Sequence, residues 1–183
     1  MKLTPPPPDI EILLLCLVAG AAVYDIRYRR IPNWLTLSGT LAGIGLNSFL
    51  RHGWSGVAFS LLGLALGFSV YFLLYLLRAM GAGDVKLMGA VGSLLGWQNW
   101  FGVFVITAIL GGVMALIVAA GKKRLHKTIW NVAYILDEMK HGRPAYLSRQ
   151  ELDVKNPNAV GLPHGAVIAV GCLFFLALSA RMG

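Results

Sequence analysis

The sequence predicts an all-α integral membrane protein with six transmembrane helices, both termini outside, and a cytoplasmic amphipathic segment between helices five and six. Three observations lead to this fold class: 57% of the 183 residues are apolar, only 13% are charged, and the apolar residues form long runs. Soluble domains are roughly 45–50% apolar and about 25% charged. We therefore exclude a disordered chain and expect a single polytopic membrane domain over residues 1–183.

A transmembrane helix needs about 20 mostly apolar residues, so each long apolar run predicts one or more membrane spans. The first run is short and resembles a cleaved signal, but acidic residues rather than a basic cluster precede it, which favours an anchored helix. The fourth and fifth helices arise from one uncharged run, divided at a polar and aromatic break over 96–99. The predicted spans are Ile10–Tyr24, Ile31–Leu50, Val57–Leu77, the two parts of Leu87–Gly121, and Val160–Ala180.

The distribution of basic residues sets the predicted orientation. Six crossings place segments 25–33, 78–86 and 121–158 on one side of the membrane, and these hold 13 of the 16 Lys and Arg residues. The positive-inside rule assigns this side to the cytoplasm, so both termini face outward. The formal charge of +8 is thereby explained by topology and by contact with an anionic lipid bilayer, and nucleic-acid binding is rejected.

The basic loop 121–158 is the only sizeable region predicted outside the membrane. Its apolar residues recur at alternating four- and three-residue steps, which places them on one helical face. Basic residues precede them, so a helix lying in the cytoplasmic interface is favoured over a partner-binding helix. The residues on this face are Leu125, Ile129, Val132, Leu136 and Met139.

Two of the eight acidic residues, Asp25 and Asp84, lie at span boundaries. They are 59 residues apart, yet the predicted topology puts both at the cytoplasmic surface. Acids beside apolar spans are costly unless they are paired, hydrated or functional. Taken singly, Asp25 could pair with a nearby arginine and Asp84 could cap a helix. Their shared depth instead favours a joint site.

The residues around Asp84 would let another helix or a substrate come close to its carboxylate. Gly81 and Gly83 precede this acid, and glycines remove side-chain bulk and permit unusual backbone angles. A neighbouring helix or an extended substrate backbone could then come close. Lys86 is expected to point elsewhere on a regular helix, as a surface anchor or a substrate contact.

The residues around Asp25 predict a turn between two helices. Pro32 favours a turn before the second span, which Asn33 follows. At the start of the last span, Gly161 and Gly165 flank Pro163, which predicts an irregular helix beginning near the same membrane surface. Both segments therefore belong to the candidate site.

Together these motifs resemble the type IV prepilin peptidases, which are membrane aspartyl proteases with a Gly-x-Gly-Asp motif. The third motif is partial, because His164 and Ala166 replace an aromatic residue and a proline that the family commonly carries there. The short chain looks like the peptidases of tight-adherence (Flp) pilus systems, and archaeal preflagellin peptidases are a nearby alternative. The resemblance rests on Asp25 with Ile31-Pro32-Asn33, on Gly81-Ala82-Gly83-Asp84 with Val85-Lys86-Leu87, and on Leu162-Pro163-His164-Gly165-Ala166.

The resemblance implies a multi-pass aspartic endopeptidase of the bacterial inner membrane with Asp25 and Asp84 as its catalytic residues. It implies cleavage of a prepilin leader at the cytoplasmic face, just before the pilin's hydrophobic helix, and pilus assembly machinery as a possible partner. Two close carboxyl groups can share a proton and activate water, so neither a metal nor a cofactor is expected. Methyltransferase activity is not expected either, because Cys16 and Cys172 form no cysteine tetrad.

Two other functions stay open at this point. In a proton- or ion-coupled transporter the two acids would bind the ion, but transporter sites typically lie near the midplane on broken helices, often with repeated halves. In a structural subunit of a pilus or secretion complex the acids would only anchor loops. Charge-neutral substitutions of the two acids distinguish these functions from proteolysis.

Overall fold

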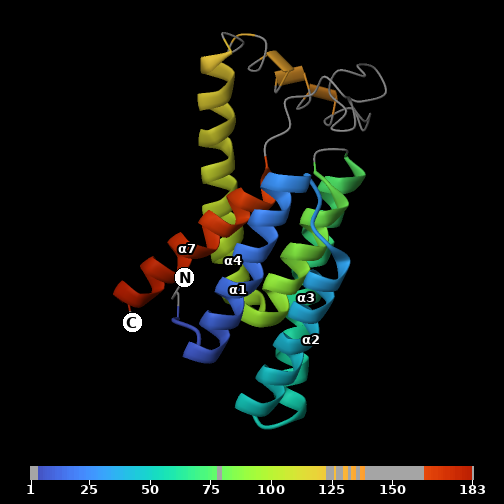
Figure 1. Ribbon diagram of the computed structural model, residues 1–183, viewed down its shortest axis with the longest axis vertical. Helices are drawn as coiled ribbons and strands as arrows, with labels where there is room; N and C mark the ends of the chain where they lie inside the picture. The colour runs from blue at the N-terminus through green and yellow to red at the C-terminus, as the bar shows by residue number, and fades with distance from the viewer. Residues whose placement is uncertain are drawn as a thin grey trace.

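The computed structural model describes residues 4–77, 80–122 and 163–182, together with seven residues between 126 and 138. None of these residues forms a β-strand, and the predicted all-α class is confirmed. Figure 1 shows the arrangement, in which α7 packs across α1 and α4. The long helices are α1 (Pro8–Tyr28), α2 (Asn33–Leu50), α3 (Trp54–Leu76), α4 (Ala82–Gly121) and α7 (His164–Met182).

Helix α4 is broken at Gly96, where φ is 70° and ψ is 172°. Glycine adopts a positive φ without steric cost, and a Cβ at this position would overlap the ring of Phe59. The indole Nε1 of Trp100 donates a 3.1 Å hydrogen bond back to the carbonyl oxygen of Met88. In Figure 1 the second part of α4, in yellow, rises toward the end of the molecule where the first part begins. The predicted break over 96–99 is therefore confirmed, and it lies at Gly96.

Close contacts between backbones hold the first part of α4 against its neighbours. Gly63 of α3 and Gly92 of α4 face each other, and a Cβ on either would meet the other's carbonyl group. Small residues at such crossings let helices approach closely inside a membrane. The buried amide of Asn47 ties α2 to α4 by donating to the carbonyl oxygens of Ser93 and Leu94, each over 3.1 Å.

Bulky apolar side chains lie on the outside of the helices. Leu37 and Leu62, for example, are each 60% exposed. Contiguous apolar surface is unfavourable in water but suits contact with lipid tails. Helices α3, α4 and α7 are long and apolar enough to cross a membrane. The chain is therefore that of a membrane protein, while the count of six crossings and the orientation stay predictions.

Helix boundaries differ from the prediction at the ends that were predicted to be cytoplasmic. Helix α1 continues to Tyr28 instead of ending at Tyr24, so Asp25 lies inside its last turn. Helix α4 begins at Ala82 rather than near Leu87, because hydrogen bonds between residues 81 and 84 start it early. The boundary between apolar and charged residues marks the edge of a membrane, not the end of a helix. The predicted interfacial helix on Leu125, Ile129, Val132, Leu136 and Met139 lies outside the described residues.

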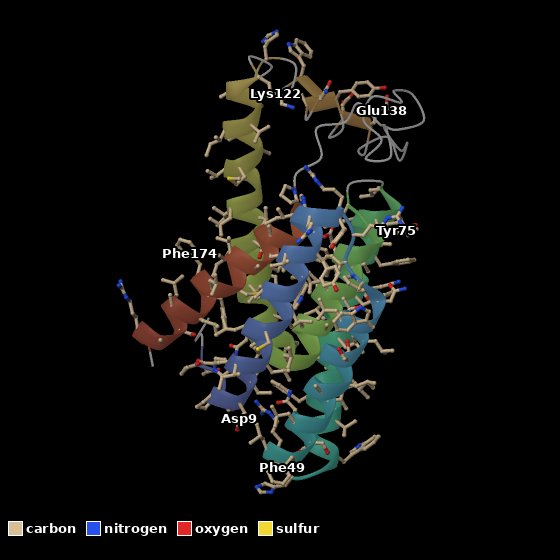
Figure 2. All side chains as sticks on the ribbon, in the orientation of Figure 1. Asp9, Phe49, Tyr75, Lys122, Glu138 and Phe174 are labelled. Atoms are coloured by element: carbon tan, nitrogen blue, oxygen red, sulfur yellow. The ribbon has the colours of Figure 1, made fainter. Side chains whose placement is uncertain are left out.

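The position of the two acids along the helix bundle follows from which helix ends lie together. In Figure 2, Tyr75 and Lys122 lie toward one end, whereas Asp9 and Phe49 lie toward the other. Helix α1 ends and α4 begins toward the same end as Tyr75 (Figure 1). The two acids singled out from the sequence therefore lie at one end of the helix bundle.

Candidate active site

Asp25 is held by the helix farthest from it in the sequence. Its side chain is 9% exposed, and its Oδ2 accepts a 2.7 Å hydrogen bond from the backbone N–H of Gly165. Gly165 is the second residue of α7, and the first N–H groups of a helix have no partner within the helix. These groups carry partial positive charge that favours a nearby carboxylate. The start of the last helix therefore lies against Asp25.

Space for a side chain is tight where α7 meets α1. A Cβ on Gly165 would lie 3.0 Å from the Cβ of Asp25 and 3.1 Å from the Cδ1 of Ile31. A larger residue would push α7 away from the carboxylate. Pro163, just before α7, accepts the backbone N–H groups of Ala166 and Val167 over 3.1 and 3.3 Å and so starts the helix.

Asp84 is held locally, within the first turn of α4. Its Oδ2 accepts the backbone N–H of Gly81 over 3.2 Å, and its own N–H donates to the carbonyl oxygen of Gly81 over 3.2 Å. The bond from the Gly81 N–H to the carboxylate three residues later is one half of a helix-capping box, and the backbone carbonyl of Gly81 replaces the side chain that glycine lacks. The capping role considered for Asp84 is therefore real. It does not compete with a role in a site, because this carboxylate also lines a cavity.

One cavity of about 510 Å³ is lined by both Asp25 and Asp84. Asp84 interacts electrostatically with Asp25 and with His164, which precedes Gly165. Small-molecule and peptide sites are typically hollows of about 300–1,000 Å³. The structure thus brings together residues from three separate segments. The other predicted site residues that line the cavity are Pro32, Asn33, Gly81, Gly83 and Lys86.

Lys86 connects α4 to the start of α2. Its Nζ donates a 2.8 Å hydrogen bond to the Oδ1 of Asn33. The sequence-based expectation was that Lys86 would point elsewhere than Asp84, yet it lines the same cavity. A lysine side chain is long and flexible, so its ammonium group can reach a neighbouring helix. The two residues are 53 positions apart, and no local pattern pairs them.

Three further residues near the site were not singled out from the sequence. Arg29 and Arg30 line the cavity, although the sequence assigned their charge to topology and considered Arg29 only as a surface partner of Asp25. Tyr71 of α3 is 1% exposed and interacts electrostatically with Asp84. A phenol inside an apolar span is a signal that could have drawn attention to it, because polar groups in such spans are costly.

This arrangement is suited to acid–base chemistry by two carboxyl groups. Each acid has one oxygen bound to a backbone N–H, so both carboxyl groups are held in a defined orientation. Two nearby carboxyl groups resist double ionisation and tend to share one proton. One can then accept a proton from water while the other donates a hydrogen bond to a carbonyl oxygen. The expectation that no metal or cofactor takes part stays a prediction.

The model of the type IV leader peptidase family matches residues 12–116. The chain is 32% identical over 113 residues to a prepilin leader peptidase/N-methyltransferase of Pectobacterium carotovorum subsp. carotovorum, which covers 58% of this chain and 40% of that protein. It is 30% identical over 129 residues to a protein of the same name from Escherichia coli strain K12, covering 67% and 55%.

A third protein of that name, from Xanthomonas campestris pv. campestris, is 28% identical over 120 residues, covering 62% of this chain and 41% of that protein. The chain thus spans between 40% and 55% of the length of these three curated relatives. No solved structure matches the chain at a significant level. The family match covers more than half of the 183 residues and includes both Asp25 and Asp84. The resemblance seen in the sequence is confirmed, and the chain belongs to the type IV leader peptidase family.

Proposed function

We propose that this protein is an aspartic endopeptidase that cleaves the leader peptide of type IV or Flp prepilins at the cytoplasmic face of the membrane. The observation that carries the proposal is a single cavity lined by Asp25 and Asp84 in a chain of this family. Prepilin as the substrate is supported by the names of the curated relatives. An archaeal preflagellin is the nearby alternative substrate.

In the proposed reaction the two carboxyl groups divide the work of hydrolysis. The ionised carboxylate takes a proton from a water molecule, whose oxygen attacks the carbonyl carbon of the scissile peptide. The protonated carboxyl group donates a hydrogen bond to the carbonyl oxygen as negative charge develops there. When the C–N bond breaks, a carboxyl proton passes to the leaving amine. The products are a leader with a new carboxyl end and a pilin with a new amino end.

The proposed setting is the bacterial inner membrane, with six spans and both termini outside. Support comes from the basic segments 25–33, 78–86 and 121–158, which the positive-inside rule assigns to the cytoplasm. The cavity is built from the end of α1 and the start of α4, which lie toward one end of the bundle. A site at the inner surface would meet a prepilin before export and would lie beside anionic lipid headgroups and the pilus assembly machinery.

The proposed activity concerns peptide cleavage alone. The names of the relatives also include N-methyltransferase. Methyl transfer by this chain is not expected, since its two cysteines, Cys16 of α1 and Cys172 of α7, form no tetrad. This expectation stays a prediction.

The direct test is cleavage of candidate prepilins by the purified full chain, with the new terminus identified by mass spectrometry. We expect Asp25→Asn and Asp84→Asn each to lower kcat on the order of 10²–10⁴-fold while membrane insertion stays normal. Asp9→Asn is the matched control, because Asp9 is exposed and lies toward the opposite end of the molecule. Normal processing by both variants would favour a structural subunit. Ion flux that responds to either substitution, without proteolysis, would favour a transporter.

A further inference from the structure

A second hollow of about 340 Å³ opens beside the catalytic cavity, between α2 and α3. Asn33 and Lys86 line both hollows. They form the boundary between the two, because the side chain of Lys86 is hydrogen-bonded to that of Asn33. We call the second hollow the lateral groove. Its remaining lining residues are Thr36, Leu37, Thr40, Leu64 and Phe68.

The lateral groove is apolar in character despite its two threonines. The hydroxyl of Thr36 donates to the carbonyl oxygen of Asn33 over 3.1 Å, and that of Thr40 donates to the carbonyl oxygen of Thr36 over 2.8 Å. Both hydroxyl hydrogens are therefore engaged with the helix backbone. Leu37 is 60% exposed and Phe68 is 42% exposed, so the groove is open on the lipid-facing side of the helices. Such a surface favours an apolar occupant over a polar one.

Contacts with α4 limit the length of the lateral groove. At one end Lys86 binds Asn33, and at the other the Oγ of Ser93 lies 3.5 Å from the carbonyl oxygen of Thr40. Seven positions separate the two contacts on each helix, and a helix rises 1.5 Å per residue, so the groove is about 10 Å long. This length fits about two turns of a helix or about three residues of extended chain.

We propose that the lateral groove binds the apolar segment of the substrate on the membrane side of the scissile bond. This inference rests on the proposed function. The groove begins at Asn33 and Lys86, where the catalytic cavity ends, so a peptide lying across Asp25 and Asp84 reaches the groove once the exposed side chain of Lys86 moves aside. The catalytic cavity contains two aspartates and two arginines, whereas the groove beyond Asn33 and Lys86 is lined by leucine, phenylalanine and threonine side chains. The enzyme therefore selects a bond at which a polar stretch changes into about two apolar helical turns.

Photocrosslinking tests this placement without relying on turnover. In an Asp84→Asn background, which keeps the substrate intact, the photoreactive benzoylphenylalanine replaces Leu64 in the full membrane-embedded chain. The matched control carries it at Leu62, which is 60% exposed on the same helix but does not line the groove. We expect position 64 to crosslink the first two turns after the scissile bond and position 62 to give at least tenfold less adduct. Adducts of position 64 with lipid alone, or equal adducts at both positions, would overturn the proposal.

Filling the lateral groove gives a second, kinetic readout. We expect Leu64→Trp to raise the KM for full-length prepilin on the order of tenfold and to leave the KM for a peptide that ends shortly after the scissile bond unchanged. Leu62→Trp should change neither value. Equal loss on both substrates would contradict a groove that binds the apolar segment. If the wild-type chain cleaves neither substrate, the proposed endopeptidase function fails, and the crosslinks still decide whether the groove binds prepilin.

Discussion

Asp25 and Asp84 line one cavity, but contacts of very different range hold them. Asp84 is fixed by Gly81, three residues before it, so its position forms together with the first turn of α4. Asp25 is fixed by Gly165, 140 residues after it, so its position requires α7 to dock on α1. The difference means that one half of the site is encoded locally, whereas the other half is completed only by tertiary packing. Disturbing the docking of α7 should therefore harm Asp25 more than Asp84.

The largest effect outside the two acids is expected from Gly165→Val. The added side chain would meet Asp25 and Ile31 at about 3 Å and displace the start of α7. A misplacement of about 1 Å in an active site can cost on the order of 10²-fold in rate, and we expect a loss of that size in kcat for prepilin cleavage. Gly45→Val is the matched control, because a Cβ there has nothing within 4 Å. Wild-type kcat in Gly165→Val would mean that the contact does not position Asp25.

A smaller effect is expected from Gly83→Ala. Its Cβ would lie 3.3 Å from the Cβ of Ile31, which must move by only a few tenths of an ångström. The hydrogen bond between Asp84 and Gly81 stays in place, so we expect kcat to fall by roughly threefold. Measuring kcat of Gly83→Ala and Gly165→Val on the same prepilin checks which loss is larger. A greater loss in Gly83→Ala than in Gly165→Val would reverse the comparison between the local and the distant half of the site.

The smallest effect is expected from Lys86→Met, which removes the hydrogen bond to Asn33 but keeps the apolar stem. Both residues are exposed, so the bond contributes little stability. We expect KM to rise roughly two- to fivefold with kcat unchanged, and Asn33→Ala to behave alike. The double variant should be no worse than either single one, because the two substitutions break the same contact. Effects that multiply in the double variant would show that the two side chains act separately.

The same difference in range explains what the sequence could predict. The residues around Asp84 are contiguous, so Gly81, Gly83 and a capping role for Asp84 were recognisable, although the helix begins earlier than the apolar run indicated. The segment of Pro163 and Gly165 was recognisable as belonging near the site. The particular N–H that binds Asp25 was not, because no local rule pairs residues 140 positions apart.

The break in α4 could be predicted from the sequence, whereas the lateral groove could not. The break in α4 was predictable because polar and aromatic residues interrupt an apolar run, and Gly96 supplies the backbone angles. The lateral groove was not, because it arises from the relative placement of side chains on α2 and α3, such as Thr40 and Leu64. Hydropathy sets which residues face lipid or core, but it carries no information on where two helices leave space between them.

The most direct test of the central claim, that Asp25 and Asp84 act together on one peptide bond, compares Asp25→Asn, Asp84→Asn and the double variant on the same prepilin. Residues that act as one unit are strongly non-additive in their effects on rate. We predict that all three variants have the same residual kcat/KM, since removing either carboxyl group already disables the pair. A single variant with wild-type kcat/KM, or a double variant whose loss is the product of the two single losses, would contradict the account.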